Sequence, residues 1–489
     1  MLPKTLGELK QDSRFPHGFR SIKDEVRNNL LGKLSGGEDL FPGIIGFEET
    51  AIPALLNALL SRHNFILLGL RGQAKSRILR QLTSFLDREI ASIEGCEIHD
   101  DPFHPICSAC QHRLQEEGDD LPIRFIPRQD RFVEKLATPD VTIADIIGDL
   151  DPIKAAKAGR GLSAVENIHF GLLPRAHRSI FAINELPDLA PKIQVGLFNI
   201  LQEGDVQIKG FPIRLPLDVL MAFTANPEDY TARGKIITPL KDRIGAEVRT
   251  HYPVRIQDGI RITRQEAWTD RCAALPVQIP GFVEEVVEAI AFQGRKDGRV
   301  DHRSGVSQRL PISCLECSAS NAERRAVRNG EKEAVVRVAD VYAALPSITG
   351  KLELEYEGEL RGAEAIAHEL IRVAVLQAFV KRFGKQQFDQ IVQWFDMGGE
   401  LAVSDQTSAD EFCSKVSSIQ GLEKPLKKLG IRPKSSSPQK AAALEFVLEG
   451  LHSQKRISRN AQRGYYREAP EPERDLLEAL RERGQRSFN

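Results

Sequence analysis

At 489 residues, the chain is long enough for about three domains of ordinary size. Its composition, with 41% hydrophobic and 28% charged residues, is that of a globular protein and excludes wholesale disorder. The 67 Lys and Arg residues nearly balance the 68 Asp and Glu residues, and the resulting net charge of −1 argues against a uniformly basic surface for nucleic acid.

Cysteine content and the lengths of the apolar runs indicate where the protein works. The amino-terminal residues lack the apolar segment of a secretory signal, and the longest apolar runs, such as residues 51–60, are too short to span a bilayer. Seven cysteines are too sparse for a disulfide framework and fit a reducing compartment. We therefore expect a cytoplasmic protein without a membrane span.

The first half of the chain alternates between two kinds of apolar pattern. Residues 1–40 are polar and predict a helical lead-in. Short apolar runs at 65–70, 179–184 and 219–226 are typical of buried strands, and segments with helical spacing separate them. This alternation predicts an α/β domain with a parallel sheet over residues 41–255.

Two segments inside this predicted domain differ from the alternation. Residues 95–122 form an acidic insertion that we expect to be irregular. Residues 205–216 alternate between apolar and polar side chains, as in a β-hairpin.

The second half of the chain is mostly helical in pattern. We divide it into a helical segment at 256–350, a mostly helical carboxy-terminal region at 351–454 and a charged tail at 455–489. The tail has little apolar material, and we expect it to be frayed or to form a surface helix.

A glycine-containing loop between a predicted strand and a predicted helix is the strongest chemical signal, with the sequence Gly69-Leu70-Arg71-Gly72-Gln73-Ala74-Lys75-Ser76. Loops of this kind wrap nucleotide phosphates with backbone N–H groups. Lys75 is expected to reach the β- and γ-phosphates, and the Ser76 hydroxyl to bind Mg²⁺. Ala74 stands where the usual pattern has Gly, and an Ala resists positive φ. The alternative is a βα turn that binds nothing.

Polar residues follow two of the predicted strands. Asn184 and Glu185 end the strand at 179–184, and Asn226 follows the strand at 219–226. Glu185 is placed to polarise a water molecule, whereas Asn184 offers an amide oxygen where a carboxylate would be expected near Mg²⁺. Asn226 is placed to hold the attacking water. Taken alone, each is also an ordinary polar strand end.

Further motifs occur in a fixed order around these residues. Gly43-Ile44-Ile45-Gly46 precedes the loop, Pro239-Leu240-Lys241-Asp242-Arg243 follows Asn226, and Gly305-Val306-Ser307-Gln308-Arg309 comes later. Over about residues 40–345 this set resembles the AAA+ ATPases, in the branch of the MoxR proteins and the magnesium chelatase ATPase subunit. The loop matches Walker A except at Ala74, and the strand at 180–185 matches Walker B except at Asn184.

The resemblance implies a P-loop core with a parallel sheet, followed by a helical lid at 256–350. It implies that Ile45 and Gly46 line the adenine pocket and that Asn226 is sensor 1. It also implies that Arg243 is a finger acting on a neighbour's nucleotide, and that Arg309 is the sensor 2 arginine of the lid. The alternative for Arg243 is a surface ion pair with Asp242 or a nearby Glu.

This family membership would make the protein a Mg²⁺-dependent ATPase working as a homo-oligomeric ring, usually a hexamer. Its motor would remodel a protein client or load it with metal, and a partner carrying a von Willebrand factor A domain is implied. Two other functions stay open. Ala74 and Asn184 favour a nucleotide-gated scaffold with little turnover, and relatives in the same branch include DNA-associated remodellers, although the charge balance argues against nucleic acid.

Cysteines and histidines cluster in the insertion. Cys96 precedes the C-x₂-C pair Cys107 and Cys110, with His99 and His104 between them. Zinc is held by four such ligands. Two interpretations stay open: a structural zinc site of the three cysteines and one histidine, or three unligated cysteines.

Overall fold

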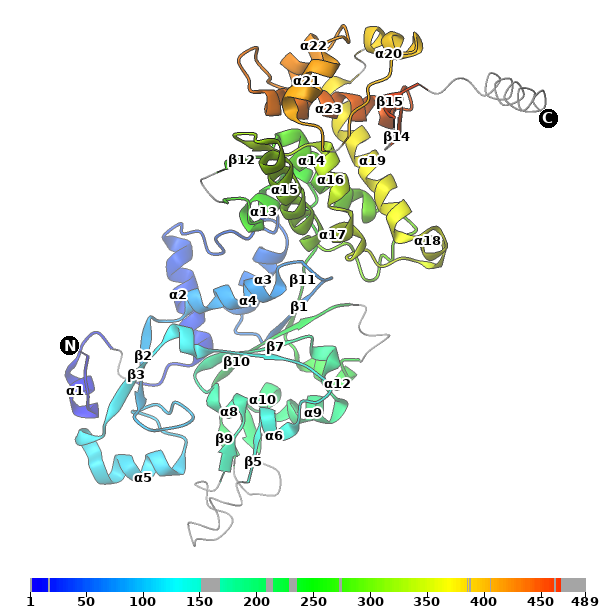
Figure 1. The fold of residues 1–489 in the computed structure, drawn as a ribbon. Coiled ribbons are helices and arrows are strands. Elements are labelled where there is room, and N and C mark those ends of the chain that lie inside the picture. Colours follow the sequence, from blue (N-terminus) through cyan, green and yellow to red (C-terminus); the bar gives the residue numbers. More distant parts are fainter. Residues whose placement is uncertain are drawn as a thin grey trace. The chain divides into compact units, whose positions relative to one another are not determined.

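The computed structural model describes residues 2–15, 18–150, 168–207, 214–227, 235–271, 275–384, 386, 388–404, 406–460 and 463–467. The chain divides into two compact units, residues 1–252 and 253–489 (Figure 1). In the described part of the chain, no helix combines the length and the apolar character needed to cross a membrane.

A five-stranded parallel sheet is the centre of the first unit, with the strand order β11-β1-β10-β7-β4. The strands are β1 (Phe65–Leu68), β4 (Phe132–Leu136), β7 (Ser179–Asn184), β10 (Val219–Ala225) and β11 (Ala246–Arg249). The predicted α/β class is confirmed, and so are the three central strands. The edge strands β4 and β11 are absent from the sequence prediction because their charged residues interrupt any apolar run.

The central strands β1, β7 and β10 are buried on both faces, which explains why their residues are mostly apolar. Alternate residues point to opposite faces: Phe65 and Leu67 of β1 join one apolar cluster, and Ile66 and Leu68 join the other. The first unit contains the helices α1 (Leu6–Gln11), α2 (Ile22–Ser35), α3 (Ala51–Leu60), α4 (Lys75–Gln81), α5 (Ser108–Glu117), α6 (Ile143–Ile146), α8 (Leu172–Arg175), α9 (Pro191–Gly196), α10 (Phe198–Gln202) and α12 (Thr238–Arg243). Helices α2, α3 and α4 supply side chains to the cluster of Phe65.

Three short antiparallel strand pairs are found in the described part of the first unit. They are β2 (Glu89–Ile93) with β3 (Ile123–Pro127), β5 (Gly148–Leu150) with β6 (Ile168–Phe170), and β8 (Asp205–Gln207) with β9 (Arg214–Pro216). The last pair agrees with the hairpin predicted at 205–216, whose turn lies outside the described residues. The prediction of an irregular insertion at 95–122 is wrong in part. Strands β2 and β3 frame it, and helix α5 fills its second half.

One apolar core holds the second unit together. Its helices are α13 (Ile256–Glu266), α14 (Gly281–Gly294), α15 (Arg309–Asn329), α16 (Val338–Ala343), α17 (Leu345–Thr349), α18 (Tyr356–Arg361), α19 (Ala363–Phe383), α20 (Asp389–Asp396), α21 (Ala409–Val416), α22 (Glu423–Lys428) and α23 (Ser437–Ser453). The parallel strands β12 (Val277–Gln278) and β13 (Ala334–Val335) also pair here. The core joins side chains from the predicted lid to others from the predicted carboxy-terminal region.

Part of the predicted charged tail is folded. Strands β14 (Ser458–Asn460) and β15 (Gly464–Tyr466) form an antiparallel pair. Tyr465 is buried, and its hydroxyl donates a hydrogen bond to the buried carboxylate of Glu449 on α23 at 2.5 Å. Residues 468–489, the rest of that predicted tail, lie outside the described residues.

Candidate functional site

The glycine-containing loop lies at the carboxyl end of the central strand β1, and α4 begins at its Lys75. The Gly69 N–H donates to the Ala225 carbonyl at 3.1 Å, which ties the loop to the neighbouring strand β10. A Cβ atom on Gly69 would come within 1.9 Å of the Thr250 hydroxyl oxygen. Only glycine therefore allows this close approach of loop and strand end.

Lys75 is buried at the base of the loop. Its ammonium donates hydrogen bonds to the carbonyls of Gly69 and, at 3.1 Å, of Leu70. Both acceptors are backbone carbonyl groups of the loop itself. The side chain thus holds a positive charge inside the curve of the loop, where an anion bound by the loop N–H groups would meet it.

Ala74 adopts the left-handed conformation, with φ 57° and ψ 13°. Gly72, two residues earlier, also has a positive φ of 72°. Ala74 thus adopts the positive φ that we expected an alanine to resist. The loop keeps the shape that a glycine at this position usually supplies. A left-handed alanine costs about 1 kcal/mol, so the loop stores a small strain.

Residues that follow β11 hold the loop from the side. The Thr250 hydroxyl donates to the Gln73 side-chain oxygen at 2.8 Å, and the Tyr252 hydroxyl donates to the Arg71 carbonyl at 2.9 Å. Gln73 and Thr250 are both buried. Sequence reasoning missed Thr250 and Tyr252, because β11 lies far along the chain and carries no motif.

The segment expected to line the adenine pocket lies close by. Gly46 has a φ of 87°, and its N–H donates to the Glu48 carboxylate at 3.1 Å, while Ile45 is half-buried. The Phe47 ring packs edge-on against His251, with ring centres 5.0 Å apart. This segment therefore packs against the same strand end that holds the phosphate loop.

Asn184 is buried at the end of β7 and makes two side-chain hydrogen bonds. Its amide nitrogen donates to the carboxylate of Glu134 on β4, and its oxygen accepts from the Thr224 hydroxyl at 3.2 Å. Arg80 of α4 also donates to Glu134, at 2.9 Å. A carboxylate absent from the expected position on β7 is thus present on the adjacent strand. No sequence motif marks Glu134.

Glu185 directly follows β7 and adopts the left-handed conformation, with φ 55° and ψ 49°. Its N–H donates to the Thr224 hydroxyl oxygen at 3.0 Å. Such a conformation in a non-glycine residue is often found at functional sites. Thr224 therefore fixes both polar residues at the end of β7.

Asn226 is buried and directly follows β10, the strand between β1 and β7. In the sheet register, Ala225 pairs with Leu68 and Phe223 pairs with Ile183. The carboxyl ends of the three strands therefore lie side by side, at what we call the carboxyl edge of the sheet. This edge brings together the phosphate loop, Glu185 and Asn226, as the sequence predicts for parallel strands.

Two further predicted site residues lie on helices α4 and α12. Ser76 is the second residue of α4 and half-buried. Arg243 ends α12, where it donates to the Gln202 side chain at 3.0 Å and to the Pro239 carbonyl at 2.8 Å. Its guanidinium lies 4.8 Å from the centre of the Phe198 ring. The alternative is a surface ion pair with Asp242 or a nearby Glu, but among the described residues Arg243 forms no such pair.

Arg309 begins helix α15 in the second unit and is exposed. Its N–H donates to the Ser307 hydroxyl at 3.1 Å. The role expected for it at the nucleotide stays a prediction.

The cysteines of the insertion come together. Cys96, Cys107 and Cys110 are buried in one apolar cluster. The pKa of Cys107 is lowered, because the thiols of Cys110 and Cys96 hydrogen-bond to its sulfur. The fourth group at this place is the carboxylate of Asp100, and the expected histidine is not part of the described cluster.

No protein-family model matches the sequence. Over 105 residues, the chain is 33% identical to the hydrogenase transcriptional regulatory protein HoxA of Cupriavidus necator, covering 21% of this chain and 22% of that protein. Over 178 residues, it is 29% identical to the archaeal Lon protease of Thermococcus kodakarensis, covering 32% of this chain and 26% of that protein. The chain thus spans about a quarter of the length of these curated relatives.

Solved structures align at low similarity. NtrX from Brucella abortus aligns with a TM-score of 0.39 and 14% identity, over 76% of this chain and 69% of that one. A model of the complex between subunits BchI and BchD of magnesium chelatase aligns with a TM-score of 0.35 and 21% identity, over 66% and 98%. In its motifs and its parallel core, the chain resembles the AAA+ ATPases of the MoxR and magnesium chelatase branch.

Proposed function

We propose that the first unit binds ATP with Mg²⁺ and hydrolyses it, as the motor core of an AAA+ protein of the MoxR and magnesium chelatase type. The observation that carries this proposal is the single sheet edge where the Lys75 loop, Glu185 and Asn226 meet. A nucleotide bound there would present its γ-phosphate to all three groups.

The loop residues Gly69, Gly72, Gln73 and Ala74 would surround the phosphates with backbone N–H groups, and Lys75 would neutralise their charge. Ile45 and Gly46 would contact the adenine. The residues present fit Mg²⁺, since the Ser76 hydroxyl and the Asn184 oxygen are the hard oxygen ligands that this ion prefers. Bound Mg²⁺ would neutralise charge on the phosphate oxygens. Glu134 would supply the negative charge that Asn184 lacks, acting through its hydrogen bond with Asn184.

Hydrolysis needs a group that removes a proton from water and a group that holds the water in line. Glu185 would act as the base, since its backbone is fixed by Thr224 in a conformation that sets the direction of its side chain. Asn226 would orient the water from the neighbouring strand. These roles are separable, because a base is lost in Glu185→Gln while the shape of the side chain is kept.

A second subunit would complete the site. The hydrogen bonds of Arg243 stay within α12 and α10, and none reaches the phosphate loop of its own subunit. An arginine finger supplied by a neighbour stabilises the charge of the transition state. We therefore propose a homo-oligomeric ring, with six subunits as in related proteins. Arg309 would sense the nucleotide from the second unit.

The work done by such a motor would be the remodelling or metal loading of a protein client. A partner with a von Willebrand factor A domain would follow the pattern of this branch. The alternative of a nucleotide-gated scaffold loses much of its support, because Ala74 keeps the glycine-like loop shape and Glu134 stands beside Asn184.

Nucleotide binding and turnover in purified full-length protein test the proposal. We expect Mg²⁺-dependent ATP hydrolysis in the unmodified chain, loss of ATP binding in Lys75→Ala, and tight binding without turnover in Glu185→Gln. Lys192→Ala and Glu203→Gln are matched controls, because both residues are exposed in the same unit. ATP binding that survives Lys75→Ala would contradict the proposed site.

A further inference from the structure

We propose that the insertion between β2 and β3 carries a tetrahedral zinc site, formed by the thiolates of Cys96, Cys107 and Cys110 and the carboxylate of Asp100. One ligand atom from each of these residues lies within 4.8 Å of all the others. All four residues are buried, and Asp100 is fully so. This site lies outside the nucleotide-binding edge and does not depend on the proposed ATPase activity.

The fold of the insertion brings these four residues together. Cys107 directly precedes α5 and Cys110 lies in its first turn, so that both sulfurs reach the same side of the helix. Cys96 follows the turn after β2, where Gly95 has a φ of 78° and the Cys96 N–H donates to the Ile93 carbonyl at 3.3 Å. Two separate segments thus converge on one point.

Asp100 is fixed more firmly than a loop carboxylate usually is. One of its oxygens accepts the Cys107 N–H at 2.9 Å, and the Ile106 N–H lies 2.9 and 3.0 Å from the two oxygens. The Asp101 N–H donates to it at 3.2 Å. Three backbone N–H groups therefore fix the direction of the Asp100 carboxylate. Zinc sites in proteins commonly show this kind of outer hydrogen bonding, which orients the ligand.

The chemistry of the four groups selects the metal. Three thiolates are soft ligands that favour zinc over Mg²⁺ or Ca²⁺, and zinc adopts the four-coordinate geometry that such a compact cluster allows. A disulfide would use two cysteines and leave the third beside a buried carboxylate. The hydrogen bonds to Asp100 compensate part of the cost of burying its carboxylate, but three neighbouring thiolates would add negative charge that requires a cation. Zinc would provide that cation.

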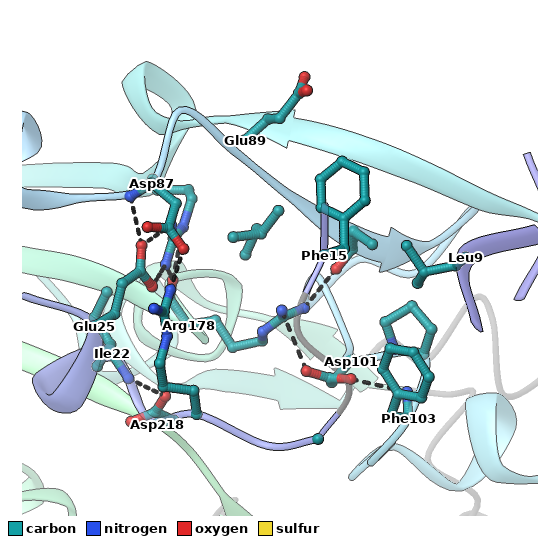
Figure 2. Close-up of a pocket in the computed structure, with 16 residues that line it drawn as sticks. Leu9, Phe15, Ile22, Glu25, Asp87, Glu89, Asp101, Phe103, Arg178 and Asp218 are labelled. Atoms are coloured by element: carbon teal, nitrogen blue, oxygen red, sulfur yellow. Dashed lines mark hydrogen bonds and ion pairs between the residues drawn. The ribbon is translucent and has the colours of Figure 1, made fainter. Parts of the chain in front are cut away.

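A metal here would brace the start of strand β7. Asp101, which follows Asp100, pairs with Arg178 at 3.2 Å, and Phe103 donates its N–H to Asp101 at 2.8 Å (Figure 2). Arg178 directly precedes β7, and its guanidinium also donates to the Ala91 carbonyl of β2 at 2.7 Å. The zinc-bound loop would therefore hold Arg178, and with it the junction of the insertion and the sheet.

Metal content of the full-length protein, purified without chelators, tests this assignment. We expect about one equivalent of zinc, released when a mercurial reagent titrates the thiols and detected with a zinc indicator. Cys107→Ser should lose the metal, whereas Cys317→Ser should keep it, because Cys317 is exposed in the second unit. Zinc below about a tenth of an equivalent in the unmodified protein, with no uptake on adding zinc, would overturn the proposal.

Cobalt substitution keeps the proposal testable if Cys107→Ser fails to fold. Unmodified protein loaded with Co²⁺ should show thiolate-to-cobalt charge-transfer absorption and the visible bands of tetrahedral Co²⁺. Asp100→Asn should weaken zinc binding by at least tenfold and shift the visible bands, while Asp119→Asn, an exposed change on the same insertion, should do neither. Octahedral cobalt bands without charge transfer would contradict the site. Unchanged affinity and spectrum in Asp100→Asn would remove Asp100 from it.

Discussion

Asn184 donates its side-chain amide to the carboxylate of Glu134, a residue fifty positions earlier in the chain and on the next strand of the sheet. The register explains the meeting, since Leu136 pairs with Asn184 and Glu134 lies two residues before it. Asn184 stands where the AAA+ ATPases that this sequence resembles carry an acid, and the carboxylate of Glu134 lies beside it. The pair therefore works as one unit in our account.

Glu134→Gln should lower Mg²⁺-dependent ATP turnover by about tenfold or more and raise the Mg²⁺ concentration needed for half-maximal rate. The substitution keeps the shape of the side chain and removes its charge. Arg80→Gln is the control, because it breaks the other contact of Glu134 while leaving the carboxylate in place. Equal losses in both variants would mean that the ion pair matters rather than the charge beside Asn184.

Moving the charge tests the same pair in a second way. Asn184→Asp should place two carboxylates within hydrogen-bonding reach, which raises the pKa of one and lowers turnover. The double variant Asn184→Asp with Glu134→Gln should recover activity, because it again has one acid and one amide. Steady-state rates of the three variants give the answer. A double variant less active than either single variant would argue against charge exchange within the pair.

Ala74→Gly should stabilise the first unit by about 0.5–1 kcal/mol. Relief of the left-handed alanine exceeds the added entropy of glycine in the unfolded chain. Ala54→Gly, on the exposed side of α3, is the matched control and should destabilise by about 1 kcal/mol. Denaturant unfolding of the two variants measures the difference. A loss of stability in Ala74→Gly would show that the positive φ is not strained.

Glu445 on α23 gives the second unit a predictable response to pH. Full burial raises its pKa to about 7, although Arg337 and Arg459 act in the opposite direction, and its carboxylate accepts the Ala339 N–H at 2.6 Å. The native state then holds a proton that the unfolded state releases near its ordinary value. The contribution to stability is therefore greatest at low pH and is lost as the pH rises to about 7.

Glu445→Gln should remove that loss, because a glutamine can accept the same N–H without ionising. Between pH 5 and 8, we expect the free energy of unfolding of the second unit to fall less in the variant, by roughly 1–3 kcal/mol. Urea unfolding at a series of pH values measures it. Parallel pH profiles for the variant and the unmodified chain would contradict the assignment to Glu445.

The sequence predicts the centre of the fold well for a physical reason. Strands β1, β7 and β10 are buried on both faces, so their apolar runs are unbroken and bounded by polar strand ends. Strands β4 and β11 lie at the sheet edges. Charged residues such as Glu134 and Arg249 interrupt the apolar runs from which a strand could be predicted. The buried Tyr465 likewise lies in a segment so rich in charge that composition alone predicts a tail.

In the candidate site, too, some residues can be predicted from the local sequence and others cannot. Lys75, Glu185 and Asn226 lie next to strand ends and can be found from local patterns. Glu134 and Thr250 reach the site only through strand pairing over long sequence separations, and neither carries a motif. Asp100 in the cysteine cluster is similar, because a pattern of cysteines and histidines favours histidine as the fourth ligand. In the folded chain the Asp100 carboxylate lies beside the three cysteines instead.

Mixing two inactive variants tests the central claim of shared ATPase sites most directly. Glu185→Gln lacks the base but keeps Arg243, and Arg243→Ala has the opposite defect. We expect ATP turnover per subunit of the unmodified protein to rise with protein concentration, each variant alone to be inactive, and an equimolar mixture to recover part of the activity. An inactive mixture, together with turnover per subunit that is independent of concentration, would contradict a motor whose sites form between neighbouring subunits.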